Sequence, residues 1–442
     1  MNALTARFSS ELQAVPMGQR LGRVVSFNGL VLEALGPDAR LGELCEIEPR
    51  DGATCVLAEV VGFREERVQL MPFGHLEGIS TDSRIRASGR PVTIPVGPAL
   101  LGRVVDAFGD PLDDDGPVEC AASYPLYRTP INPMARAPIE DVLETGVRAI
   151  DTLLTLGVGQ RVGVFAGSGV GKSTLLGMLA RQVKADVTVL ALIGERGREV
   201  GEFLTHSLGE DGRKRAVVIA ATADESALVR VHAAHAAHAV AEYFRDQGQS
   251  VLLMVDSMTR FAMAQREIGL AIGEPPTFRG YTPSVFSQLP KLLERCGRLR
   301  SGGAISGVYS VLVEGDDMNE PVTDHMRAIL DGHIVLTRDL AARGHHPAID
   351  VLHSSSRLMH QVASEDESAL ATAAKRHLAI HEASRDLIEL GAHQRGANPA
   401  LDRAVDLKPA LDRLMQQTPR ESTPRAEACR QMASAVATEV VA

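Results

Sequence analysis

The chain has 442 residues, which is enough for two or three domains with a large buried core. Hydrophobic residues make up 45% and charged residues 23%, the balance of an ordinary globular protein. A formal net charge of −10, only 4% aromatic residues and no tryptophan disfavour a nucleic-acid-binding protein, which needs basic surfaces and rings that stack on bases.

The first sixteen residues predict a short helix, because Leu4, Phe8 and Leu12 fall on one stripe. This helix either docks a partner or packs on its own domain, and the sequence leaves both interpretations open. After this segment, residues 21–86 contain short β-rich runs separated by glycines and turn residues, as in a small β-barrel. The same segment has more acidic than basic residues, which argues against an RNA-binding barrel. We assign residues 1–88 to this first domain.

After a proline-rich connecting stretch, strand-like runs alternate with helical ones. The strand-like runs are residues 163–166, 187–194, 216–220, 250–255, 304–313 and 333–336. This alternation predicts an α/β domain in which a parallel sheet is covered by helices. We assign residues 89–357 to this domain.

Beyond residue 357 the strand-like runs stop and helical patterns take over. One helical stretch covers residues 365–390 and is closed by Gly391. Asn398-Pro399 and Thr423-Pro424 each combine a capping side chain with a proline in the first turn, so they indicate two further helix starts. Residues 358–442 are therefore predicted to form a C-terminal helical domain.

A glycine-rich loop, Ala166-Gly-Ser-Gly-Val-Gly-Lys-Ser173, lies between a strand-like run and a helical one. Glycines let successive backbone amides point into one concavity, and the helix N-terminus adds partial positive charge, so the loop can wrap phosphates. We expect Lys172 to reach the outer phosphates and the Ser173 hydroxyl to complete the ligand shell of a bound Mg²⁺. The residues expected to bind the phosphates are Gly167, Ser168, Gly169, Val170, Gly171, Lys172, Ser173 and Thr174. Although Ala166 replaces the usual first glycine, and a turn that binds nothing is the alternative, the loop predicts a nucleoside triphosphate with Mg²⁺.

Two acidic residues follow apolar strand-like runs of the same domain. Asp256 comes after the run at residues 251–255, and Glu195 comes after the run at residues 187–194. Because ligands of such sheets bind beyond the carboxyl ends of the strands, both are candidates for the triphosphate site. We expect Asp256 to hold Mg²⁺, directly or through water, and Glu195 to activate the attacking water. The alternatives are an ordinary turn residue at Asp256 and a solvated charged loop at Glu195.

Seven longer motifs follow one another along the chain. They are Gly194-Glu-Arg-Gly-Arg-Glu199, Asp256-Ser-Met-Thr-Arg-Phe-Ala-Met-Ala-Gln-Arg-Glu267, Gly273-Glu-Pro-Pro276, Gly280-Tyr-Thr-Pro-Ser-Val-Phe286, Glu314-Gly-Asp-Asp-Met-Asn-Glu-Pro321, Ile329-Leu-Asp-Gly-His333 and Pro347-Ala-Ile-Asp350. With these motifs the chain resembles the rotary ATPase family, and most closely its type III export branch of flagella and injectisomes. The resemblance implies an N-terminal β-barrel, a central RecA-like P-loop domain and a C-terminal helical domain. It also implies a homohexameric ring with ATP sites between the subunits.

The resemblance gives roles to three further positions. Arg196 helps to position Glu195 or the γ-phosphate. Arg357, in Ser354-Ser-Ser-Arg357, matches the arginine that reaches into the neighbouring subunit's site and meets the charge that develops on the transferring phosphoryl group. The alternative for Arg357 is a surface or ion-pairing arginine. His346 stands where the family usually has a tyrosine that stacks on adenine, and a histidine ring can also stack.

The leading hypothesis is an ATP-hydrolysing motor subunit of a flagellar (type III) protein export apparatus. The alternatives are an injectisome secretion ATPase, a catalytic subunit of a rotary ATP synthase, an RNA helicase with the same core, and a ring subunit that binds nucleotide without hydrolysing it. The acidic N-terminal barrel disfavours the helicase. Glu195 together with Lys172 and Arg357 disfavours the non-catalytic subunit.

The resemblance also implies partners. These are a coiled-coil central stalk protein, a stator-like regulator at the N-terminal helix, the export gate and chaperone–substrate complexes. The acidic, aromatic-poor composition predicts no nucleic-acid partner. Five cysteines without a CxxC pair fit a reducing cytoplasm, and no apolar run is long enough to span a bilayer. We therefore expect a cytoplasmic protein whose association with a membrane is only peripheral. The resemblance implies that this membrane is the inner membrane at the export apparatus.

His232, His235 and His238 are spaced three apart on a predicted helix. Such spacing can indicate a metal site. No acidic or cysteine residue continues the pattern, so we do not expect these histidines to hold a metal.

Overall fold

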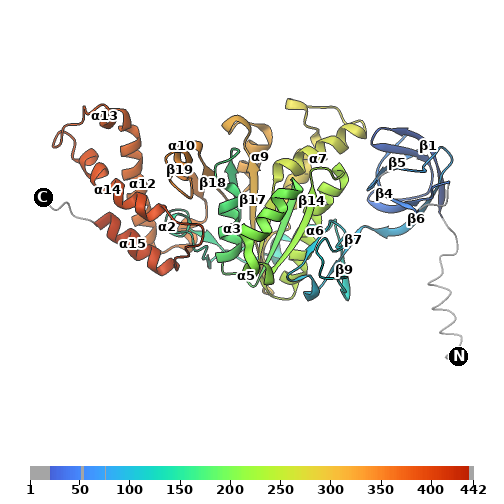
Figure 1. Ribbon diagram of the computed structural model, residues 1–442, viewed down its shortest axis with the longest axis horizontal. Coiled ribbons are helices and arrows are strands. Elements are labelled where there is room, and N and C mark those ends of the chain that lie inside the picture. Colours follow the sequence, from blue (N-terminus) through green and yellow to red (C-terminus); the bar gives the residue numbers. More distant parts are fainter. Residues whose placement is uncertain (1–19, 51–53, 75, 438–442) are drawn as a thin grey trace, which may run out of the picture. The chain divides into compact units, whose positions relative to one another are not determined.

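The computed structural model describes two compact units of the chain (Figure 1). Among the described residues, the first unit contains those from 20 to 93 together with residues 226–228 and 267–275, and the second contains the others up to residue 437. The helix expected within the first sixteen residues lies outside the described residues. The domain boundaries at residues 88 and 357 stay predictions. The described residues are 20–50, 54–74 and 76–437.

The first unit is built on a closed antiparallel barrel with the strand order β1-β2-β5-β4-β3-β6. Its strands are β1 (Leu21–Asn28), β2 (Val31–Leu35), β3 (Glu43–Ile47), β4 (Val56–Arg64), β5 (Arg67–Pro72) and β6 (Arg84–Pro91). Apolar side chains from these strands, among them Leu32, Ile47, Leu70 and Ile85, are buried inside the barrel. Closure of the barrel leaves no unpaired strand edge. The predicted small barrel is confirmed.

The centre of the second unit is a sheet with the strand order β19-β18-β12-β17-β15-β13-β14-β8, and β16 pairs with β17. Its strands are β8 (Val104–Val105), β12 (Arg161–Ala166), β13 (Val187–Glu195), β14 (Ala216–Thr222), β15 (Ser250–Asp256), β16 (Gly297–Arg298), β17 (Ala304–Leu312), β18 (Gly332–Leu336) and β19 (Ile349–Ser356). Neighbours in the main order are parallel except β18 and β19, which are antiparallel. The inner strands are buried along nearly their whole length, as is usual for parallel strands covered on both faces.

The strand-like runs of the sequence therefore mark the inner strands of the sheet correctly. They do not mark β8 and β16, which have only two residues each, or β19, in which polar residues interrupt the apolar ones. Of these three strands, β8 and β19 lie at the two edges of the sheet order, and β16 pairs with β17 outside that order. An edge strand is recognised by its pairing partner more than by its own pattern.

Helices connect the strands and flank the sheet (Figure 1). They are α2 (Arg148–Leu153), α3 (Lys172–Gln182), α4 (Gly197–Glu202), α5 (Gly209–Lys214), α6 (Ala227–Asp246), α7 (Met258–Ala271), α8 (Pro283–Leu293), α9 (Pro321–Ile329), α10 (Arg338–Ala342) and α11 (Met359–Val362). A π-helical turn joins α4 to α5 at Phe203–Leu208. Two short strand pairs complete the unit: β10 (Val142–Leu143) with β11 (Leu156–Gly157), and β7 (Thr93–Val96) with β9 (Ala122–Pro125).

The C-terminal part of the second unit is helical, as predicted. Its helices are α12 (Glu365–Ala383), α13 (Arg385–Glu389), α14 (Pro399–Met415) and α15 (Arg425–Ala437). The stretch expected as one helix over residues 365–390 is divided at Ser384, whose backbone leaves the helical conformation. The Asn398 side chain caps α14 by accepting hydrogen bonds from two amides of the first turn. Apolar residues of α12 and α14, such as Leu378 and Leu411, belong to the same buried cluster as residues of the sheet.

Candidate active site

The glycine-rich loop turns the chain from β12 directly into α3. Gly169 and Gly171 have φ angles of +79° and +93°, which residues with a side chain rarely adopt. No atom lies within 4 Å of the position that a Cβ would take at either glycine. Within the described part of the chain, the amides of Ser168, Gly169 and Gly171 donate no hydrogen bond to a protein acceptor. Free amides in front of a helix N-terminus form a cradle for an anion such as phosphate.

Lys172 lies between the two strand-end carboxylates that the sequence singles out. Its Nζ is 2.5 Å from Oδ1 of Asp256 and 3.5 Å from Oε1 of Glu195. Burial lowers the pKa of Lys172, but the two carboxylates outweigh this effect and raise the pKa above its usual value. The side chain is therefore charged at neutral pH. The structure brings together Lys172, Glu195 and Asp256 from three different elements, α3, β13 and β15.

Glu195 ends β13 beside a small cavity. The cavity has a volume of about 30 Å³ and is lined by Ser173, Glu195, Glu199 and Asp256 together with apolar side chains. This volume is enough for about one water molecule. Burial raises the pKa of Glu195, Lys172 opposes the rise, and the charge of Asp256 adds to it, with a net shift upward. A carboxylate with raised proton affinity beside a water-sized space can act as a general base.

Asp256 is held in place by a residue of the neighbouring strand β17. The hydroxyl of Ser310 donates a hydrogen bond to Oδ1 of Asp256 at 2.6 Å, and both side chains are buried. Val255 pairs with Tyr309 in the parallel register, so the next residues of the two strands lie side by side. No pattern in the sequence identifies Ser310 as part of the site, because its position depends on the order of the strands.

An ion pair packs against the first glycine of the loop. Nε of Arg338 lies 3.3 Å from Oδ2 of Asp316. A Cβ at residue 167 would lie 2.5 Å from Oδ1 of Asp316 and 3.3 Å from Nε of Arg338. A side chain at residue 167 would therefore displace the ends of these two half-exposed side chains. Asp316 belongs to the motif at residues 314–321, which the sequence marks without giving this residue a role.

The Arg196 side chain points into solvent and does not contact Lys172. Its side chain is 84% exposed, and its guanidinium lies 3.7 Å from the carboxylate of Glu199. The residue is the N-cap of α4, with extended backbone. Its role beside Glu195 or the γ-phosphate stays a prediction.

Arg357 lies at the end of the sheet opposite to the phosphate loop. The loop follows Ala166, which pairs with Leu336 at the carboxyl end of β18. Because β19 runs antiparallel to β18, its last residue, Ser356, pairs with Gly332 at the amino end of β18. Four steps along a strand correspond to ~13 Å. The exposed guanidinium of Arg357 donates hydrogen bonds to two carbonyls at the end of α9, at 3.0 and 3.4 Å.

His346 lies in the loop between α10 and β19, and its side chain is exposed. Its carbonyl accepts a hydrogen bond from the amide of Gln417 at 2.8 Å, and its peptide bond to Pro347 is cis. The loop is thereby attached to the segment that follows α14. Whether the ring stacks on a base stays a prediction.

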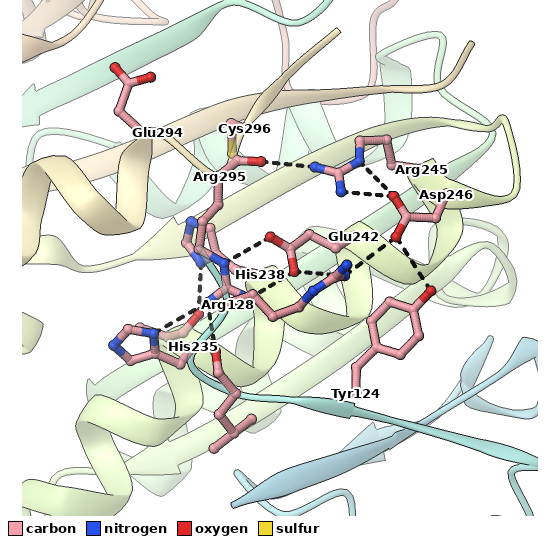
Figure 2. A network of polar contacts seen from close by, with 12 residues as sticks. Tyr124, Arg128, His235, His238, Glu242, Arg245, Asp246, Glu294, Arg295 and Cys296 are labelled. Carbon is pink, nitrogen blue, oxygen red and sulfur yellow. Dashed lines mark hydrogen bonds and ion pairs between the residues drawn. The ribbon is translucent and has the colours of Figure 1, made fainter. Parts of the chain in front are cut away.

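The histidines of α6 are bonded to protein groups. Nε2 of His238 lies 3.0 Å from the hydroxyl of Tyr309, and its Nδ1 lies 2.8 Å from the carbonyl of Ala234. Nδ1 of His235 lies 3.3 Å from the guanidinium of Arg295, as Figure 2 shows. Over residues 20–50, 54–74 and 76–437, no three His, Cys, Asp or Glu side chains are placed to hold a metal ion.

The loop and its surroundings fit a triphosphate with Mg²⁺. The open amides and the Lys172 ammonium suit phosphate oxygens. The hydroxyl of Ser173 and the carboxylate of Asp256 line the same small cavity, and oxygen ligands of this kind suit Mg²⁺. A glycine loop between a strand and a helix, with two strand-end carboxylates facing its lysine, defines the chain as a P-loop nucleotide-binding protein.

Comparison with known proteins supports a P-loop nucleotide-binding protein and identifies its family. Residues 24–89 match the ATP synthase alpha/beta family, beta-barrel domain, and residues 146–356 match its nucleotide-binding domain. Residues 363–434 match the T3SS EscN ATPase C-terminal domain. The flagellum-specific ATP synthase of Treponema pallidum is 51% identical, over 91% of this chain and 90% of that protein. The type 3 secretion system ATPase of Xanthomonas euvesicatoria is 48% identical, over 94% of this chain and 93% of that protein.

Solved structures give the same result. The assembled ATPase EscN from the type III secretion system of enteropathogenic E. coli is 43% identical and has a TM-score of 0.89. The similarity covers 94% of this chain and 100% of that one. EscN in complex with its central stalk EscO has a TM-score of 0.87, with the same identity and coverage.

The chain belongs to the family of flagellum-specific ATP synthases and type 3 secretion system ATPases, an ATP-hydrolysing enzyme family. The predicted three-part fold and the predicted use of ATP are confirmed. The flagellum-specific relative and the type 3 secretion relative have similar sequence identity to this chain. The flagellar and the injectisome assignments are therefore supported equally. Among the described residues, no helix is both long and apolar enough to cross a membrane.

Proposed function

We propose that the chain hydrolyses ATP with Mg²⁺ as one subunit of a homohexameric ring that energises type III protein export. The observation that carries this proposal is the separation of Arg357 from the other site residues. Lys172, Glu195 and Asp256 converge at one end of the sheet. Arg357 lies ~13 Å away along the strands, at the other end. A catalytic site that includes this arginine is completed only by a second copy of the chain.

In the proposed reaction, Lys172 and the loop amides hold the phosphates. The Ser173 hydroxyl and the Asp256 carboxylate would hold Mg²⁺, which would supply positive charge to neutralise the phosphates. Glu195 accepts a proton from water while the water oxygen bonds to the γ-phosphorus and the bond to the leaving ADP oxygen breaks. Arg357 of the neighbouring copy stabilises the charge that develops on the transferring phosphoryl group.

The other roles concern the rim of the site. We assign Arg196 to the positioning of Glu195 or the γ-phosphate, which its place directly after Glu195 supports. We assign His346 to stacking on the base, which its exposure supports. The phosphates contact Gly167, Ser168, Gly169, Val170, Gly171, Lys172, Ser173 and Thr174.

The proposal includes partners and a location. The complex of EscN with its central stalk EscO supports a central stalk partner, and assembled EscN supports an oligomer. The family resemblance supports a coiled-coil stalk against the C-terminal helices and a ring of subunits. The family resemblance supports a stator-like regulator at the N-terminal helix, the export gate and chaperone–substrate complexes as further partners. It also supports a cytoplasmic subunit that associates peripherally with the inner membrane. The functional domains in this proposal are residues 1–88, 89–357 and 358–442.

A mixing experiment tests the shared site. Arg357→Ala is expected to bind ATP normally and to hydrolyse it ~10³-fold more slowly, the lower end of the range for arginine fingers. Lys172→Ala is also expected to be inactive, because it lacks the phosphate contact. In mixed rings, an Arg357→Ala subunit supplies an intact loop to an arginine from a Lys172→Ala subunit. Phosphate release is therefore expected to recover in part when the two inactive variants are combined.

The control is Arg430→Ala, which removes an exposed arginine of α15 that pairs with Glu427. This variant is expected to hydrolyse ATP at the normal rate. If mixed rings form, as cross-linking of the two tagged variants can show, and no activity returns, Arg357 does not act on a neighbouring copy.

A further inference from the structure

The two carboxylate oxygens of Asp256 have different surroundings. Oδ1 lies 2.5 Å from Nζ of Lys172 and accepts a hydrogen bond of 2.6 Å from the hydroxyl of Ser310. Oδ2 accepts no hydrogen bond from any described residue, and it keeps accessible surface. Asp256 also lines the small cavity beside Glu195. Oδ2 is therefore the oxygen that remains for a ligand such as Mg²⁺.

Two side chains donate to Oδ1, and only one of them has no second assignment. The proposed function gives the Lys172 ammonium to the phosphates, so this lysine shares or leaves Oδ1 when a nucleotide binds. Ser310 is fully buried on β17, and its hydroxyl has one proton, which it donates to Asp256. Ser310 therefore keeps Oδ1 bonded whichever partner Lys172 contacts.

The sheet fixes the position of this hydroxyl. Val255 pairs with Tyr309 in the parallel register of β15 and β17. Ser310, the next residue of β17, therefore lies beside Asp256. Side chains alternate between the two faces of a strand, and the Tyr309 hydroxyl lies 3.0 Å from Nε2 of His238 instead. An aspartate carboxylate rotates over a broad range when nothing holds it, and a hydrogen bond from a buried strand to one oxygen restricts this rotation.

We propose that Ser310 is a positioning residue for Mg²⁺ and acts through Asp256. This inference rests on the proposed function, in which the Asp256 carboxylate holds Mg²⁺. The hydroxyl holds Oδ1 beside β17 and thereby keeps Oδ2 available to the metal or to a water bound to it. Hydrogen-bond partners of metal ligands typically contribute about 10–100-fold to metal affinity. No step of ATP hydrolysis uses Ser310 itself.

The test compares nucleotide binding with and without the metal. The Kd of a fluorescent, non-hydrolysable ATP analogue is measured for the full chain in EDTA and in excess Mg²⁺. The ratio of the two Kd values gives the coupling between Mg²⁺ and the nucleotide. Ser310→Ala is expected to keep the Kd in EDTA within about twofold and to lower the ratio about tenfold. A purely structural role would weaken binding equally in both conditions and leave the ratio unchanged.

Ser306→Ala is the matched control, because Ser306 is another buried serine of β17. Its hydroxyl oxygen accepts a hydrogen bond from the amide of Gly159 at 2.8 Å, and it has no contact with Asp256. This variant is expected to lose stability and to keep the ratio of the unmodified chain. Ser310→Thr keeps the hydroxyl in a residue type that suits a strand, and its ratio is expected to stay within about threefold.

Circular dichroism checks that each variant is folded. If Ser310→Ala does not fold, Ser310→Cys takes its place, because a thiol is only a weak donor, and its ratio is expected to fall about fivefold. Three results would overturn the inference and leave the proposed function intact: an unchanged ratio for Ser310→Ala, an equal fall for Ser306→Ala, or a fall for Ser310→Thr as large as that for Ser310→Ala. A ratio of about one for the unmodified chain would contradict the proposed use of Mg²⁺ itself, and the inference with it.

Discussion

Lys172 connects the two strand ends of the candidate active site, because its ammonium contacts carboxylates from β13 and β15. Removing this lysine leaves Glu195 and Asp256 without their nearest positive charge, so a Lys172 variant changes the whole site. Glu195 is the more selective probe of mechanism. Its replacement by glutamine keeps the size of the side chain and removes only its charge and its capacity to accept a proton.

Glu195→Gln is therefore expected to bind ATP with an affinity close to normal and to lower kcat by about 10²–10⁴-fold. The reason is that a neutral amide cannot take the proton of the attacking water. Single-turnover phosphate release and the Kd of a fluorescent ATP analogue separate the two effects. Glu202→Gln is the control, since this half-exposed residue of α4 pairs with Arg198. A near-normal kcat for Glu195→Gln would remove this residue from the mechanism.

At the scale of elements, the start of α12 is attached to α15 through one carboxylate. Glu367 accepts hydrogen bonds from the amide of Ser364 at 3.0 Å and from the guanidinium of Arg425 at 2.6 Å. Ser364 in turn accepts from the amide of Glu367, which completes a capping box. Burial raises the pKa of Glu367, but the hydrogen bonds from Arg425 and Ser364 outweigh it and lower the pKa to about 2.

A carboxyl group whose pKa is lowered by folding stabilises the fold above its ordinary pKa, here 4.5. This contribution is lost as the pH falls from 4.5 toward 2. Glu367→Gln is expected to lower the free energy of unfolding at pH 7 by about 1.5–3 kcal/mol, the range for hydrogen bonds to charged groups. The difference from the unmodified chain is expected to shrink toward pH 3.

Urea unfolding followed by circular dichroism over a pH series measures this difference. Glu365→Gln changes an exposed acid in the same helical turn and is expected to have little effect. A difference for Glu367→Gln that stays constant from pH 7 to ~pH 3 would show that the ionised form is not favoured by folding.

At the scale of the whole molecule, a buried polar network joins distant segments of the second unit (Figure 2). Arg295, which is 1% exposed, donates two hydrogen bonds of 2.9 Å to Glu242 on α6. It also donates to the carbonyl of Leu126 in the connecting stretch at 2.8 Å. Arg128 from the same stretch adds a contact of 3.2 Å to Glu242. The network thus holds the connecting stretch against α6 and the end of α8.

Arg295→Met is expected to lower the free energy of unfolding by about 3–5 kcal/mol, because Glu242 stays buried without its main counter-charge. The double variant Arg295→Met/Glu242→Leu is expected to be less destabilised than Arg295→Met alone, since both charges are then removed. Urea unfolding of the full chain compares the single and double variants. A double variant that loses as much stability as the two single variants combined would contradict this account.

The sequence by itself determined the local features of this protein. The phosphate loop, the acids after the apolar strands and the Asn398 cap of α14 each depend on residues only a few positions apart. The strand-like runs predicted the parallel sheet because buried strands are apolar along their whole length. Lys172, Glu195 and Asp256 could therefore be assigned to one end of a sheet before the order of its strands was known.

Only the tertiary structure decided which residues from distant parts of the chain lie next to these local features. Ser310 contacts Asp256 because β17 is the neighbour of β15, and Arg357 lies opposite to the loop because β19 runs antiparallel to β18. Strand order, strand direction and helix packing arise from contacts between residues far apart in the chain, and no local pattern encodes them.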